Sequence, residues 1–86
     1  MLVIKKIQQV FFEAVITGKK KSEFRLHDFE VQEGDILRLI EVDTNKKETG
    51  RSVEKVVTYV SKVDLKNTYW PVEEILEKGI QVISFE

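Results

Sequence analysis

The sequence predicts an α+β fold in which about five to six short strands form a small, partly open β-barrel flanked by two short helices. Three observations lead to this class. The 86 residues suffice for one modest hydrophobic core but not for two. Short runs rich in valine and isoleucine recur between turn residues, and two other segments place apolar residues at helical spacing. Residues 1–86 are therefore predicted to form a single domain.

The first third of the chain predicts a strand, a helix and a second strand. Residues 2–7 alternate loosely between apolar and polar side chains, which favours a strand. From about residue 8 to residue 17, an apolar stripe of helical spacing contains Val10, Phe11, Ala14 and Val15. Gly18 follows as a typical helix-ending glycine. Residues 20–26 are then predicted to form a strand.

The rest of the chain predicts a hairpin, a short helix and a closing strand. Residues 36–42 are rich in branched apolar side chains, and 44–50 are polar enough for a hairpin tip. Residues 51–63 are predicted to be a long antiparallel partner. A helix of about two turns follows Pro71, with acids in its first turn and a lysine and a glycine at its end. Residues 80–85 alternate as a last strand.

The charge of the chain is nearly balanced but unevenly distributed. Fourteen Lys and Arg oppose 15 Asp and Glu, which gives a net charge of −1. This balance argues against a protein that grips long duplex nucleic acid by bulk charge. Residues 17–28, however, hold four cations and two anions, whereas residues 71–86 hold four anions and one cation. Such a dipolar surface can attract a small anionic ligand or a few phosphates.

Several classes of site are excluded by composition. The sequence has no cysteine, so disulfides, thiolate metal sites and a cysteine nucleophile are absent. The N-terminal apolar run is too short for a signal peptide, and no run of about 18 apolar residues occurs. His27 is the single histidine and has no second ligand at metal spacing. We expect a cytoplasmic protein without a membrane partner, a metal or another cofactor, with a monomer as the default.

The segment 18–25, Gly-Lys-Lys-Lys-Ser-Glu-Phe-Arg, is the strongest candidate for a functional site. On a strand, Lys21, Glu23 and Arg25 would face one side and Phe24 the other. The charged face has two interpretations. It is either a solvated outer surface on which Glu23 is screened by two cations, or the wall of a ligand site.

Two arginines and several aromatic residues are further candidates. The planar guanidinium groups of Arg25 and Arg38 match phosphates or base edges, although cross-strand pairs with Glu23 or Glu41 explain them equally well. Aromatic side chains that can stack on unpaired bases are Tyr59, Tyr69 and Trp70. Trp70 precedes a proline and is predicted to plug the core, so Tyr69 is the better surface candidate.

Five motifs in a fixed order carry a resemblance to a known group of domains. They are 18–25 (GKKKSEFR), 29–39 (FEVQEGDILRL), 41–43 (EVD), 49–51 (TGR) and 57–60 (VTYV). In this order the chain, from about residue 4 to residue 85, resembles uncharacterised small bacterial and phage domains related to the ASCH domains, whose fold is PUA-like. The resemblance implies a β-barrel with a cleft beside the first helix, into which the lysine-rich segment projects.

The resemblance also implies a link to RNA. We therefore expect a cleft that binds RNA or a nucleotide-like small molecule, with lysines facing phosphate, Arg25 fixing orientation and an aromatic ring stacking on a base. The candidate binding residues are Lys19, Lys20, Lys21, Glu23, Arg25, Arg38 and Tyr69. A protein-interaction module is a third possibility, for which the sequence supplies no distinct signal.

A catalytic alternative comes from the same resemblance. A few ASCH relatives resemble amidohydrolases that deacetylate a modified cytidine of the N4-acetylcytidine kind, with a lysine, a threonine three positions later and a distant glutamate. Aligned by Gly18, Lys20 takes the lysine position and Glu23 the threonine position. A carboxylate attacks amides poorly and suits acid or base work, so these two residues would activate water instead. Glu41 and Glu54 are the candidates for the third role, and binding is the favoured prediction.

Overall fold

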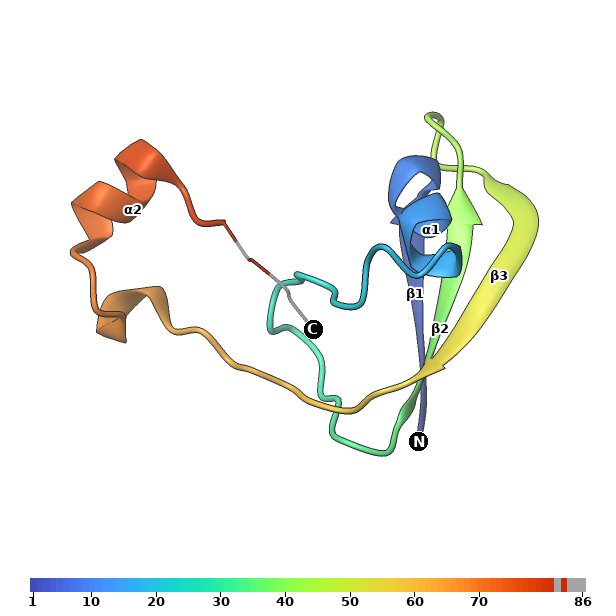
Figure 1. Cartoon of the computed structure of the whole chain (residues 1–86), viewed down its shortest axis with the longest axis horizontal. Helices are drawn as coiled ribbons and strands as arrows, with labels where there is room; N and C mark the ends of the chain where they lie inside the picture. The colour runs from blue at the N-terminus through green and yellow to red at the C-terminus, as the bar shows by residue number, and fades with distance from the viewer. Residues whose placement is uncertain (82, 84–86) are drawn as a thin grey trace.

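The computed structural model describes residues 1–81 and 83, and Figure 1 shows a small sheet with one helix packed on it and a C-terminal arm that leads to a second helix. The elements are, in order, β1 (Leu2–Gln8), α1 (Gln9–Ile16), β2 (Ile36–Val42), β3 (Glu48–Val56), a 3-10 turn (Leu65–Asn67) and α2 (Val72–Lys78). These elements confirm the α+β class. Within this part of the chain, no helix combines the length and the apolar character needed to cross a membrane.

The described strands form an open sheet in the order β1-β2-β3. β1 runs parallel to β2, with Leu2 opposite Ile36, and β2 runs antiparallel to β3. The parallel pairing requires a long connection, which α1 and the loop before β2 provide. A register shift between Ile40 and Val42 interrupts the β2-β3 ladder near the hairpin.

The hydrophobic core lies between α1 and one face of the sheet. Its buried members are Ile7, Phe12, Val15 and Leu39, and the partly buried Leu37 and Val53 pack against them. Alternation along β2 places the side chains of Leu37, Leu39 and Glu41 on this same face. The core therefore fixes α1 over the centre of the sheet, and the segment that leaves α1 starts from a defined position.

The end of α1 agrees with the sequence. The helix was predicted over about residues 8–17 and spans Gln9–Ile16. Gly18 has φ +81°, the left-handed conformation that glycine adopts most easily. Its amide donates to the carbonyl of Val15 at 3.1 Å, and the Lys20 amide donates to Ala14 at 2.9 Å. This compact turn ends the helix and reverses the direction of the chain.

The prediction of a strand over residues 20–26 is wrong. That segment is neither helix nor strand. It lies beside the outer edge of β1, where the Arg25 guanidinium donates to the backbone carbonyl of Lys6. The Arg25 side chain thus hydrogen-bonds to a backbone carbonyl of β1 that would have accepted from a neighbouring strand.

The second half of the chain departs further from the predicted barrel. The strand predicted over residues 51–63 ends at Val56, and the chain continues without a ladder partner. Of the closing strand predicted over residues 80–85, residues 80, 81 and 83 are not in a strand and the others lie outside the described residues. The described sheet therefore has three strands and stays open, and closure into a barrel of five to six strands is not seen.

The helix predicted after Pro71 is confirmed as α2, Val72–Lys78. The core position predicted for Trp70 is wrong, since its side chain is 57% exposed. The reason is topological: residues 57–71 form an arm that leads away from the sheet and α1 (Figure 1). Trp70 instead meets Tyr69 edge to face, with ring centroids 5.7 Å apart.

Candidate ligand-binding cavity

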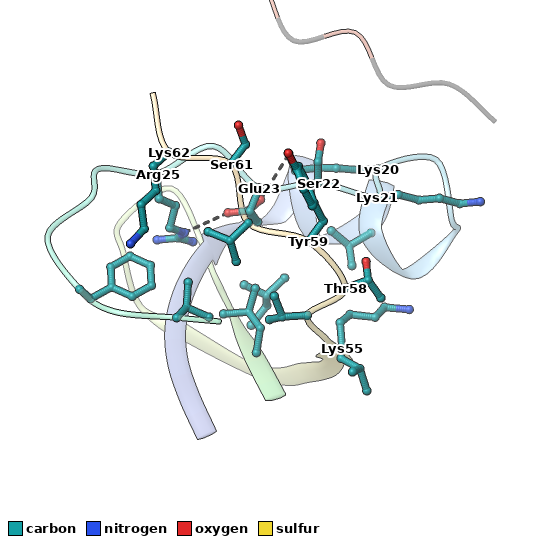
Figure 2. Close-up of a pocket in the computed structure, with 18 of the residues that line it drawn as sticks. Lys20, Lys21, Ser22, Glu23, Arg25, Lys55, Thr58, Tyr59, Ser61 and Lys62 are labelled. Carbon is teal, nitrogen blue, oxygen red and sulfur yellow. Dashed lines mark hydrogen bonds and ion pairs between the residues drawn. The ribbon is translucent and has the colours of Figure 1, made fainter. Parts of the chain in front are cut away.

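A cavity of about 490 Å³ lies between the segment that follows α1 and the arm that follows β3 (Figure 2). This volume falls within the range of about 300–1,000 Å³ that is typical of small-molecule sites. The side chains that make the cavity apolar come from α1, the strands and both loops; they include Val15, Val31, Leu37, Leu39, Val56 and Val60. We refer to it as the first cavity.

Backbone hydrogen bonds hold the two walls of the first cavity. The turn at Gly18 directs residues 20–26 along the edge of β1. On the opposite side, the Gly34 amide donates to the carbonyl of Val57 at 2.8 Å, and the Val57 amide donates to Asp35 at 2.9 Å. The first residue of the arm is thereby fixed to the turn that precedes β2. The start of the arm, residues 57–62, lines the first cavity together with Leu37 and Leu39 of β2.

One carboxylate organises two cations in the wall of the first cavity. Glu23 Oε1 lies 3.3 Å from Lys20 Nζ, and Glu23 Oε2 accepts from Arg25 Nε at 2.9 Å. All three side chains are partly buried, with 24%, 19% and 28% of their surfaces exposed for Lys20, Glu23 and Arg25. Partial burial weakens solvent screening, so this triad holds both cations in place more firmly than an exposed ion pair would.

The remaining charged side chains leave the first cavity strongly cationic. Five basic residues line it against one acidic residue, namely Lys20, Lys21, Arg25, Lys55 and Lys62 against Glu23. Figure 2 shows Arg25 and Lys62 at one end and Lys21 and Lys55 at the other, with Glu23 between them. An apolar hollow with cations at two ends suits a ligand that has a flat apolar part and at least one anionic group.

The structure brings together only part of the predicted site. Lys20, Lys21, Glu23 and Arg25 line the first cavity, together with Tyr59. Lys19, Arg38 and Tyr69 do not line it. Arg38 instead donates twice to its ladder neighbour Glu54, at 2.9 and 2.7 Å. Tyr69 lies on the distant arm and is 92% exposed.

Lys55 and Lys62 were missed by the sequence analysis. Lys55 lies opposite Leu37 in the β2-β3 ladder, so its side chain shares the face of the core residues Leu37 and Leu39. The register of the hairpin would have placed Lys55 on this face. The predicted hairpin tip, residues 44–50, overlaps the start of the observed β3, Glu48–Val56, so the predicted register was not correct. Lys62 lies beyond the end of β3, where no ladder indicates which way a side chain points.

The two glutamates proposed for a third catalytic role lie elsewhere. Glu41 is 2% exposed and is held by Arg51 and Thr49 beside α1. These hydrogen bonds, chiefly those from Arg51, hold the pKa of Glu41 below its usual value. Glu54 pairs with Arg38. Neither glutamate lines the first cavity, so neither accompanies Lys20 and Glu23 there.

Comparison with known proteins gives one family. A family model described as a domain of unknown function, DUF3850, matches residues 4–72. This range includes all of the sheet except the first two residues of β1, and it includes α1 and the residues that line the first cavity. No curated protein and no solved structure matches the chain.

Proposed function

The chain belongs to the DUF3850 family of domains of unknown function, and we propose that its first cavity binds one nucleotide unit, either free or as part of a single-stranded RNA. The observation that supports this function is the combination of an apolar hollow of about 490 Å³ with cations at both ends. A base would lie against the apolar side chains and a phosphate would meet the cations. Lysine and arginine are the side chains that most often bind phosphate.

The triad of Lys20, Glu23 and Arg25 favours specific binding of a nucleotide over attraction by overall charge. Because Glu23 already holds Lys20 and Arg25, these two side chains lose little conformational entropy when a ligand binds. Lys55 is not held in this way: within residues 1–81 and 83 it has no ion-pair partner. The cavity therefore offers a fixed cationic wall and a lysine that can adjust to the phosphate.

We further propose the ASCH-related, PUA-like relationship that the motif order implies. It is supported by the placement of the lysine-rich segment beside a cavity next to α1, as expected for such domains. Closure into a barrel would require strands beyond the three that are described. A cytoplasmic location belongs to the same proposal, and the absence of cysteine is compatible with it.

Titration with the four ribonucleoside monophosphates at low salt tests the function. We expect binding that weakens with added salt and with a shallow dependence, because one nucleotide neutralises few charges. Chemical-shift changes should fall on residues 18–25 and 55–62. A Lys55→Glu variant should bind at least about tenfold more weakly, since it places repulsion where attraction was. The matched control Lys47→Glu, at the hairpin outside the cavity, should bind like the parent.

Two results would argue against the proposal. One is the absence of any shift in residues 18–25 and 55–62 with all four nucleotides. The other is equal weakening by Lys55→Glu and Lys47→Glu, which would indicate attraction by overall charge. Inorganic phosphate should bind more weakly than the nucleotides, because it leaves the apolar part of the cavity empty.

The 3.3 Å contact between Lys20 and Glu23 supports a second candidate, hydrolysis of an acylated nucleoside of the N4-acetylcytidine kind. A coupled ammonium and carboxylate in a cavity wall can position and activate water. Both Glu23 oxygens already contact cations, however, which favours a role in holding those cations. Release of acetate that disappears in Lys20→Ala would support the enzyme. No turnover by the parent would remove it and leave the binding proposal intact.

A further inference from the structure

A second cavity, of about 630 Å³, lies on the other side of the same triad. β1 lines it through Lys5, Lys6, Ile7 and Gln8, and α1 contributes Phe11. The residues that line both cavities are Lys20, Glu23, Arg25, Leu26 and Phe29. We refer to the three charged residues among them as the ridge. Neighbouring residues in the chain line different cavities: Lys21 lines only the first cavity and Phe24 only the second.

Three phenylalanines line the second cavity, and two of them already have cations over their rings. Lys5 Nζ lies 3.8 Å from the centroid of Phe29, and Lys20 Nζ lies 5.7 Å from that of Phe11. Phe24 differs, because it meets neither a ring nor a cation in the part of the chain that the structure describes. Its side chain is 69% exposed beside a charged ridge. Phe24 is thus a ring available for stacking.

We propose that Phe24 is the stacking platform for a second nucleotide, so that the ligand is a single-stranded RNA of at least two units that crosses the ridge. This inference rests on the proposed function of the first cavity. Stacking on an exposed aromatic ring is how unpaired bases are commonly bound, and every base offers a face for it.

The charges of the second cavity fit this ligand. Its lining has four cations and two anions, namely Lys5, Lys6, Lys20 and Arg25 against Glu23 and Asp28. Lys20 and Arg25 face both cavities and are placed to contact the phosphate that joins the two nucleotides. A duplex could not follow this path, because its bases are already stacked on one another and cannot separate onto Phe24.

The experiment compares a mononucleotide with a 5′-phosphorylated dinucleotide and trinucleotide of RNA at one low salt concentration. We expect the dinucleotide to bind roughly tenfold more tightly than the mononucleotide, as one added stack predicts. Phe24→Ala should abolish this gain and leave mononucleotide binding unchanged. Phe24→Trp should keep the gain, and Phe24→Leu, which retains bulk without an aromatic face, should lose most of it. Leu76→Ala, an exposed apolar position on α2 outside both cavities, is the control and should behave like the parent.

The outcomes separate this inference from the proposed function. If the mononucleotide binds but the dinucleotide gains nothing, or if the gain survives in Phe24→Ala, the second subsite is excluded and the first remains. If neither ligand binds, the proposed function itself fails. A dinucleotide gain that requires an aromatic residue at position 24 supports both.

Discussion

Arg51 of β3 donates two hydrogen bonds to the buried carboxylate of Glu41 in β2, from Nε at 3.0 Å and from Nη2 at 2.8 Å. The same Nη2 also donates to Glu13 of α1, and the guanidinium carbon lies 4.8 Å from the centroid of the Phe12 ring. Thr49 adds a hydrogen bond from its hydroxyl to Glu41. One arginine thus joins both strands of the hairpin to α1, the helix from which the lysine-rich segment departs.

Glu41→Gln should destabilise the protein more than Glu54→Gln does. Both substitutions weaken an arginine pair between β2 and β3, but Glu41 is buried whereas the Arg38-Glu54 pair is exposed. Loss of the exposed pair should cost about 0.2–1 kcal/mol. Loss of the Glu41 charge weakens hydrogen bonds from two side chains to a carboxylate that is almost fully buried. Urea unfolding of the two variants measures the difference, and equal losses would contradict the structural role of Glu41.

Asp35 should contribute a pH-dependent part of the stability. It accepts from the Gln32 amide at 2.9 Å and from the Met1 ammonium at 3.0 Å. The backbone hydrogen bond from Gln32 is the main cause that holds the pKa of Asp35 below its ordinary value of 3.8, and the Met1 ammonium adds to it. Because the pKa is lower in the folded state, this stabilisation is present above about pH 4 and is lost as pH falls through the folded pKa.

Asp35→Asn is therefore expected to be less stable than the parent at neutral pH and to lose less stability between about pH 5 and pH 2. The free energy of unfolding as a function of pH measures this directly. An unchanged slope in Asp35→Asn would show that Asp35 does not carry this dependence.

Elements whose own residues carry a clear local pattern could be predicted from the sequence. The apolar stripe and Gly18 defined α1, and the branched residues of 36–42 defined β2. Pro71 with Gly79 defined α2 in the same way. In each case the local pattern and the turn residues agreed, so no knowledge of distant neighbours was needed.

The failures occur where a neighbour decides the structure. Residues 20–26 alternate like a strand, but the Arg25 side chain occupies a carbonyl on the edge of β1. Trp70 has the character of a core residue, yet the arm carries it away from the core. Four of the predicted binding residues meet in one cavity, whereas the opposite wall, with Lys55, depends on the hairpin register. Such long-range pairing is not contained in a local pattern.

Gly18→Ala should lower the stability by about 1 kcal/mol, since a left-handed conformation is unfavourable for any residue with a Cβ. Gly18 has φ +81°, and a Cβ at this position would meet no heavy atom within 4 Å. The cost should therefore come from the backbone and not from a clash. Gly18→Asn should cost less, because asparagine tolerates this conformation better. Thermal unfolding of both variants provides the measurement, and a neutral Gly18→Ala would contradict the conformation assigned to this turn.

Phe12→Ala should lower the stability of the protein much more than Phe24→Ala does. Phe12 is 2% exposed and packs with Ile7, Val15 and Leu39 between α1 and the sheet, so its truncation should cost about 3–5 kcal/mol. Phe24→Ala removes the same atoms from a side chain that is 69% exposed and should change stability by no more than about 0.5 kcal/mol. The loss expected at Phe12 approaches the whole stability of many small domains, about 5–15 kcal/mol. Phe12→Leu, which retains most of the buried surface, keeps the measurement possible if Phe12→Ala does not fold. Similar unfolding midpoints for Phe12→Leu and Phe24→Leu would show that the core does not depend on the contact between α1 and the sheet.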